Sequence, residues 1–292
     1  MYGRFFMYFS IIPFSHSIGT SPLIYLGEGI IENNIQVGSL VEIPYGNSIE
    51  NGIITKIYID SPINIASEAH TRIKTITRIV TPRIILAQYQ IDMVCAISAR
   101  YMIPIHRVLA IFLPRPILTR LERKNYEQLE NSLTTIHPDQ QRKLHIVQDT
   151  IVIPELVDTY MKWPTIVILP DDFAMIPYRE YYPDRDDILF MSNDMTDVRK
   201  AQAWIDISNG VFPIIYWTRK ILDYNLSKYS NILYIEDSLG PDYWHYPIRI
   251  HYNDILRIFI QENPLISFSI ITSIPTLATL THFRNFEIKN IQ

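Results

Sequence analysis

The sequence predicts an α/β protein in two parts: a small β-barrel closed by helices, and then a parallel sheet covered by helices on both faces. Residues 5–80 consist of short stretches rich in β-branched and aromatic residues, separated by Gly, Asn or Pro. Residues 84–113 have the periodicity of helices. Beyond about residue 116, continuous apolar stretches alternate with helical segments, which is typical of a parallel sheet buried on both faces.

In the first part, the start of the chain is aromatic and apolar but too short to span a bilayer, so it predicts a first strand. Further strands are expected in IYLGEGI (24–30), VGSLVEIPYGN (37–47), NGIITKIYI (51–59) and RIKTITRIV (72–80). Gly38, Gly46 and Gly52 fall where strands must turn, and this spacing favours a small, OB-like barrel or a curled sheet. Pro104 divides residues 84–113 into two helices that would close the barrel.

The second part is expected at residues 137–292, after a charged connector at 116–136 whose sequence predicts a helix. Strands are expected in TIVILP (165–170), ILFMS (188–192), FPIIYWT (212–218), NILYIED (231–237) and SFSIITS (267–273), with helices around TDVRKAQAWIDI (196–207) and YNDILRIFIQ (252–261). The first domain therefore comprises residues 1–115.

Composition and charge restrict the function. Hydrophobic residues make up 48% of the chain and charged residues 19%, a globular composition. Residues 1–115 carry 9 basic and 7 acidic side chains, whereas residues 116–292 carry 17 and 23, so nucleic-acid contact is expected in the first part. The single cysteine, Cys95, excludes a disulfide framework and a zinc site with several thiolates, and it favours a cytoplasmic location. No metal and no cofactor are expected.

The first part resembles the 3′-end DNA-binding domain of the PriA family of replication-restart helicases (primosomal protein N′). The resemblance rests on VGSLVEIPYGN, NGIITKI, RIKTITRIV and SARYMIPIHRVLAIFLP (98–114). It implies that Tyr25, Gly46 and Lys74 surround a 3′ nucleotide, with Arg72 and Arg78 beside Lys74.

Two features of the sequence weaken the case for a 3′-end site. Leu23 and Ile24 replace the Phe-Asp pair of the family, which removes an acceptor for a terminal hydroxyl and weakens the case for strict 3′-end selection. The alternative for Lys74, its two arginine neighbours and Lys56 is an ordinary solvated strand face.

The second part is similar to the first RecA-like lobe of the same family, a superfamily 2 helicase fold. The similarity rests on HPDQQRKL (137–144), TIVILPDDFAM (165–175), MTDVRKAQAW (195–204), Thr218-Arg219, IHYND (250–254) and TSIPTLATL (272–280).

The chain departs from this lobe where ATP would bind. The family's Gly-Lys-Thr loop corresponds to LHIVQDTIVI (144–153), which places Asp149 at a glycine and Val152 at the lysine, and no glycine occurs between Gly52 and Gly210. Backbone N–H groups can close around phosphates only where glycines allow it. The family's Asp-Glu-Glu-His becomes Glu236, Asp237, Ser238 and Leu239, without the base and the coupling histidine.

Three hypotheses follow. The first is a truncated, degenerate PriA-like protein that binds forked or 3′-ended DNA in DNA replication or replication restart, without ATPase or helicase activity. The second is an interaction module whose acidic second domain docks a restart protein or single-stranded-DNA-binding protein. The third is one part of a split helicase. No membrane partner is expected.

Overall fold

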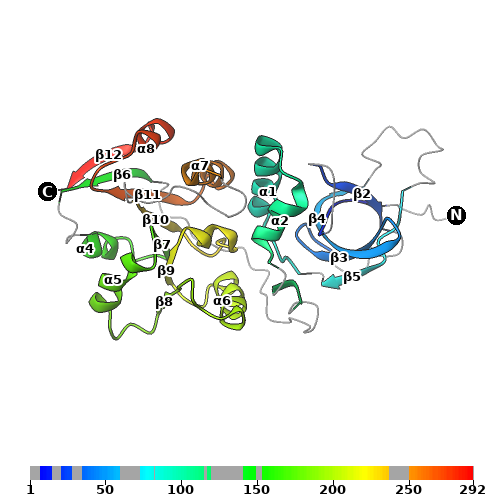
Figure 1. The fold of residues 1–292 in the computed structure, drawn as a ribbon, viewed down its shortest axis with the longest axis horizontal. Helices are drawn as coiled ribbons and strands as arrows, with labels where there is room; N and C mark the ends of the chain where they lie inside the picture. Colours follow the sequence, from blue (N-terminus) through cyan, green and yellow to red (C-terminus); the bar gives the residue numbers. More distant parts are fainter. Residues whose placement is uncertain are drawn as a thin grey trace. The chain divides into compact units, whose positions relative to one another are not determined.

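The computed structural model describes residues 7–14, 21–27, 35–59, 73–81, 83–114, 117–119, 141–148, 153–236 and 250–291. The chain divides into two compact units, Met1–Asn131 and Ser132–Gln292 (Figure 1). The expected connector helix at 116–136 lies outside the described residues except for 117–119, which are helical.

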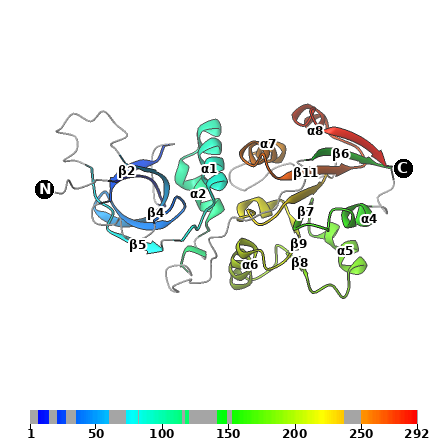
Figure 2. The ribbon, with the colours of Figure 1, turned by 180° about the vertical axis from the view of Figure 1, so that it is seen from behind.

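The first unit contains a five-stranded antiparallel sheet in the order β2-β1-β4-β3-β5. Its strands are β1 (Tyr8–Pro13), β2 (Leu23–Leu26), β3 (Leu40–Tyr45), β4 (Ser48–Tyr58) and β5 (Arg78–Thr81). The sheet is strongly curled, as both views show (Figure 2). Gly52 allows this curl, because a side chain there would collide with Ile11 on the neighbouring strand.

The two edges of the curled sheet meet at one place. The N–H of Leu26, at the end of β2, donates to the carbonyl of Lys74 at 2.9 Å, and the N–H of Ile76 donates to the carbonyl of Leu26 at 2.9 Å. Residues 74–76 precede β5, which is the opposite edge strand. The expected barrel is therefore a curled sheet whose edges are joined by a short bridge and not by a continuous ladder of the described strands.

Two helices complete the first unit, as the sequence predicts. They are α1 (Gln88–Tyr101) and α2 (Ile105–Phe112), and Pro104 occupies the N-cap of α2. They pack side by side next to the curled sheet (Figures 1 and 2). The core inside the sheet is apolar and includes the buried side chains of Phe9, Ile11 and Tyr25.

The second unit contains a seven-stranded parallel sheet in the order β12-β6-β11-β10-β7-β9-β8. The strands are β6 (Arg142–Val147), β7 (Thr165–Leu169), β8 (Ile188–Phe190), β9 (Ile214–Thr218), β10 (Asn231–Ile235), β11 (Ser267–Thr272) and β12 (Glu287–Ile291). The α-helices are α4 (Ile153–Asp158), α5 (Ile176–Tyr181), α6 (Asp197–Asn209), α7 (Tyr252–Glu262) and α8 (Leu277–His282). Two 3-10 helices, η3 (Phe173–Met175) and η4 (Arg219–Asp223), follow β7 and β9.

Both faces of this sheet are covered, which is why its central strands are apolar without alternation. On one face, Val157 of α4 and Tyr178 of α5 pack in a cluster with Leu233 of β10. On the other face, Tyr252 of α7 packs against Tyr234 of β10, with ring centroids 5.4 Å apart. The predicted α/β class is confirmed, and the RecA-like assignment stays a prediction.

Within the part of the chain that the structure describes, no helix has both the length and the apolar character needed to cross a bilayer.

Candidate nucleic-acid interface

The hairpin turn between β3 and β4 forms the centre of the candidate interface. Tyr45 and Ser48 are the last paired residues, which leaves Gly46 and Asn47 as a two-residue turn. Gly46 has a φ of 58°, a conformation that side chains other than glycine adopt at a cost. Because a Cβ at Gly46 would meet no atom within 4 Å, the space over this turn is open to a ligand.

Lys74 lies at this turn, 28 residues further along the chain. Its Nζ donates to the carbonyl oxygen of Gly46 at 2.9 Å, and its side chain is exposed. The backbone bridge between Leu26 and Lys74 brings Lys74 to this position. An ammonium group has three N–H donors, so the carbonyl leaves donors that can reach phosphate oxygens.

Tyr25 lies beneath the same turn but is only 4% exposed. Its hydroxyl donates to the carbonyl of Pro44 at 3.4 Å, two residues before Gly46. Burial, and then the proximity of Tyr45, raise the pKa of Tyr25. Tyr25 is therefore a support for the turn and offers no open ring face for stacking. The residues that replace the family's Phe-Asp pair differ in exposure: Leu23 is 37% exposed and Ile24 is half-buried.

The other predicted basic residues do not all gather here. Arg78 forms an ion pair with Glu42, with its Nε 2.7 Å from Oε2, so its charge is already partly neutralised. Lys56 is exposed on β4, eight residues after Ser48 at the turn. Arg72 lies outside the described residues. The structure thus brings together Gly46 and Lys74 above Tyr25.

The sequence prediction missed polar and aromatic groups at this turn. Tyr45 is half-buried beside Tyr25, and the Ser48 hydroxyl donates to the Tyr45 carbonyl at 3.0 Å and to Glu50 at 3.1 Å. Their positions immediately before and after the Gly-Asn pair were the available signal, because hairpin partners next to a two-residue turn face each other.

In the second unit, Glu236 of the acidic motif accepts hydrogen bonds from two threonine hydroxyl groups. Glu236, at the carboxyl end of β10, is 7% exposed. Its Oε1 accepts from the Thr276 hydroxyl at 3.0 Å and also from the Thr279 hydroxyl. Thr276 is the N-cap of α8, where its Oγ1 accepts from the N–H of Thr279 at 3.1 Å. One carboxylate oxygen therefore holds the start of α8 against β10.

The neighbouring motif residues also have structural partners. His251 caps α7, where its Nδ1 accepts from the N–H of Asn253 at 3.3 Å. Arg219, at the end of β9, is buried over the ring of Tyr252 at 5.3 Å. Asp149, Val152 and Asp237 lie outside the described residues. No group of three or more metal-binding side chains occurs within the described ranges.

Comparison with known proteins adds one finding. The family model of the PriA 3′DNA-binding domain (3′BD) matches residues 21–114. This segment spans β2 to α2 and contains the turn at Gly46, together with Tyr25 and Lys74. No curated protein matches the chain.

Proposed function

We propose that the first unit binds DNA that carries a 3′ end, such as a fork, and that the chain acts in replication restart without hydrolysing ATP. The observation that carries the proposal is the Lys74 ammonium group held at the carbonyl of Gly46 within the segment that resembles a 3′DNA-binding domain. Restart proteins or single-stranded-DNA-binding protein as partners, and a cytoplasmic location, stay predictions.

The mode of binding follows from the chemistry of the turn. The exposed ammonium group of Lys74 would contact phosphate oxygens near the strand end, and the glycine would let the backbone approach the nucleotide closely. No carboxylate occurs at Leu23 or Ile24, so recognition of a terminal hydroxyl would depend on other acceptors, such as the nearby carbonyl groups.

The test is fluorescence anisotropy of the full chain with a labelled fork that carries a free 3′ end. We expect Lys74→Ala to weaken binding about tenfold, because one charge-assisted contact contributes about 1.5–3 kcal/mol and this one is exposed. Lys56→Ala is the matched control: it removes another exposed lysine, on β4 eight residues after Ser48, and should change the affinity less than twofold.

Two further measurements separate end recognition from simple charge attraction. Affinity should fall as salt rises, with a shallower slope for Lys74→Ala. A fork whose 3′ end is blocked by a phosphate should bind more weakly than the free end. Equal loss with both lysine variants would replace the end-binding proposal by non-specific attraction, and absence of binding at 50 mM salt would overturn it.

The absence of ATP hydrolysis is supported by two observations. The segment between β6 and α4, where the family places its phosphate loop, contains no glycine. Of the two acidic residues in the motif, Glu236 is described, and its Oε1 accepts from the hydroxyl groups of Thr276 and Thr279. A carboxylate in that network stabilises α8, a structural role that needs no metal ion.

We expect no DNA-stimulated release of phosphate from ATP by the purified chain. Glu236→Gln distinguishes a true activity from contamination, because an amide retains a carbonyl acceptor for the threonine hydroxyls but cannot bind Mg²⁺ as a carboxylate does. Phosphate release that disappears in Glu236→Gln while the variant stays folded would show that this chain hydrolyses ATP.

A further inference from the structure

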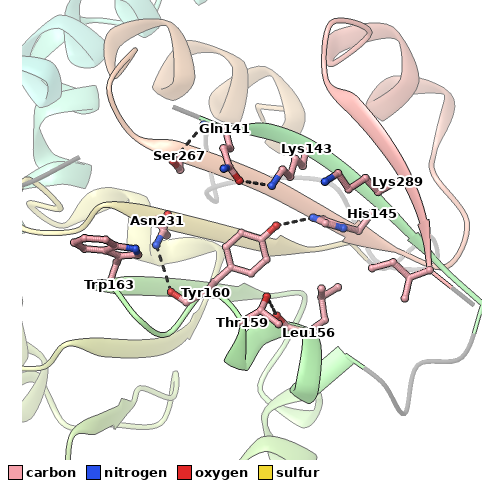
Figure 3. A pocket seen from close by; sticks show the side chains of 11 residues that line it. Gln141, Lys143, His145, Leu156, Thr159, Tyr160, Trp163, Asn231, Ser267 and Lys289 are labelled. Carbon is pink, nitrogen blue, oxygen red and sulfur yellow. Dashed lines mark hydrogen bonds between the residues drawn. The ribbon is translucent and has the colours of Figure 1, made fainter. Parts of the chain in front are cut away.

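A cavity of 410 Å³ lies on one face of the parallel sheet and is lined by residues of β6, β10, β11 and β12. Figure 3 shows it between the sheet and the segment that follows α4. Its polar lining comes from β6 and the residue before it, from the first residues of β10 and β11, from β12 and from that segment: Gln141, Lys143, His145, Thr159, Tyr160, Asn231, Ser267 and Lys289. Glu236 lies at the opposite, carboxyl end of β10. Glu236 does not line the cavity, whereas Gln141 and Lys143 belong to HPDQQRKL (137–144), one of the stretches on which the similarity to the RecA-like lobe rests.

The register of three strands places the cavity's polar groups on one face. Lys143 and His145 are two residues apart on β6, so they share a face. Lys289 of β12 is paired with His145, and its ammonium group points toward that of Lys143 (Figure 3). Ser269 of β11, paired with Lys143, has its hydroxyl 3.4 Å from that of Tyr160.

Two ammonium groups therefore approach each other at the cavity. Burial, and then the charge of Lys289, lower the pKa of Lys143, as expected when two positive charges lie close together. Lys143 also donates to the side-chain oxygen of Gln141. Glu287 lies 3.6 Å from Lys289 and balances at most one of the two charges. An anion between the lysines would relieve the remaining repulsion.

The interior of the cavity is polar but uncharged. His145 is 3% exposed, and burial, followed by the charges of Lys143 and Lys289, lowers its pKa to about 4, so its ring is neutral at pH 7. Its Nε2 lies 2.7 Å from the Tyr160 hydroxyl. The positive charge is consequently confined to the two lysines at one end, and a ligand would be oriented with its anionic group there.

Aromatic rings line the other end. Figure 3 shows the ring of Tyr160 in the middle of the site and Trp163 at the end away from the lysines. Trp163 is 41% exposed, whereas Trp204 and Trp217 of the same unit are buried. The Asn231 side chain lies beside Tyr160, where its Nδ2 donates to the Tyr160 carbonyl at 3.4 Å. A flat, hydrogen-bonding ring system suits this end.

We propose that this cavity binds a small organic phosphate of about mononucleotide size, with its phosphate between Lys143 and Lys289 and its ring near Tyr160 and Trp163. The volume lies within the range of small-molecule sites, roughly 300–1,000 Å³. A phosphate suits the site because its several oxygens can accept from two ammonium groups and from the Gln141 amide at once. This site is independent of DNA binding by the first unit.

Isothermal titration of the full chain with adenosine monophosphate, adenosine and inorganic phosphate tests the proposal. We expect adenosine monophosphate to bind more tightly than either fragment, since only it contacts both ends of the cavity. Lys289→Gln should weaken its binding about tenfold, the loss of one charge-assisted contact of about 1.4 kcal/mol or more. Lys289 is exposed on an edge strand, so this variant is expected to fold, which circular dichroism verifies.

The matched control is Lys162→Gln, which removes an exposed lysine beside Trp163 that does not line the cavity. It should leave the affinity within twofold of the wild type. Absence of binding at millimolar adenosine monophosphate, or an equal loss in both lysine variants, overturns the proposal. Equal affinity for adenosine and for adenosine monophosphate overturns the placement of the phosphate, and equal affinity for inorganic phosphate overturns the ring contact.

Discussion

His145 illustrates how one buried side chain makes stability depend on pH. Its ring is enclosed by Tyr160, and Lys143 and Lys289 lie near it, with Glu287 as the opposing charge. Desolvation and the two lysines disfavour the imidazolium ion and hold the pKa of His145 in the folded protein at about 4, below its ordinary value of 6.5. The unfolded chain therefore takes up a proton at a higher pH than the folded one.

Because the pKa of His145 is lower in the folded than in the unfolded protein, acid destabilises the fold. The stabilisation is complete above pH 6.5 and is lost as the pH falls toward 4, because the unfolded state binds more protons in that window. We expect the wild type to lose about 2–3 kcal/mol more unfolding free energy between pH 7 and pH 4 than His145→Gln does. Urea denaturation of both proteins at the two pH values measures the difference. Parallel losses would contradict the assignment to His145.

At the scale of elements, α6 shows a complete set of helix-end signals. Thr196 is its N-cap and its side chain accepts from the N–H of Arg199 at 3.4 Å, while Gly210 ends the helix with a φ of 70°. We expect Thr196→Ala to lower the unfolding free energy by about 1 kcal/mol, because an N–H at the helix start loses its acceptor. Thr196→Ser keeps the hydroxyl and should behave as the wild type in urea denaturation followed by tryptophan fluorescence. Equal stability of both variants would show that the cap contributes nothing.

The strongly periodic and apolar elements could be predicted from the sequence. The helices α1, α2, α6 and α7 and the buried strands β7, β9, β10 and β11 all lie where the patterns indicate. In contrast, β12 (EIKNI) was not predicted, because an exposed edge strand carries no apolar run. The six-residue helix α8 was interpreted only as a motif, since it is too short to show a helical period.

The two candidate sites also differ in how far they could be predicted from the sequence. The members of the turn site, Tyr25, Gly46 and Lys74, could be named from motifs, but their proximity depends on the register of the curled sheet. No pattern in the sequence predicts that Arg78 is paired with Glu42, because the two residues are 36 positions apart and lie on different strands. The cavity could not be foreseen at all, because its lining comes from four strands and the segment after α4, and no two of its charged residues form a motif.

At the scale of the whole molecule, each of the two units contains its own apolar cluster. One includes Phe9 and Val41 inside the curled sheet, and the other includes Val167 and Tyr216 in the parallel sheet. The four tryptophans, Trp163, Trp204, Trp217 and Trp244, all belong to the second unit, so tryptophan fluorescence reports on that unit alone. Far-ultraviolet circular dichroism reports on both.

We therefore expect two unfolding transitions in urea, only one of which changes the tryptophan fluorescence, because separate cores allow separate cooperative units. Two variants that lower the unfolding free energy by similar amounts show which transition belongs to which unit. Ile43→Val removes one methylene from the buried core of the first unit, at about 1 kcal/mol, and should shift only the circular-dichroism transition that fluorescence does not detect. Thr196→Ala should shift only the fluorescence transition. If each variant moved both transitions together, the two units would unfold as one, and a ligand bound to the cavity of the second unit would then also stabilise the turn at Gly46 in the first.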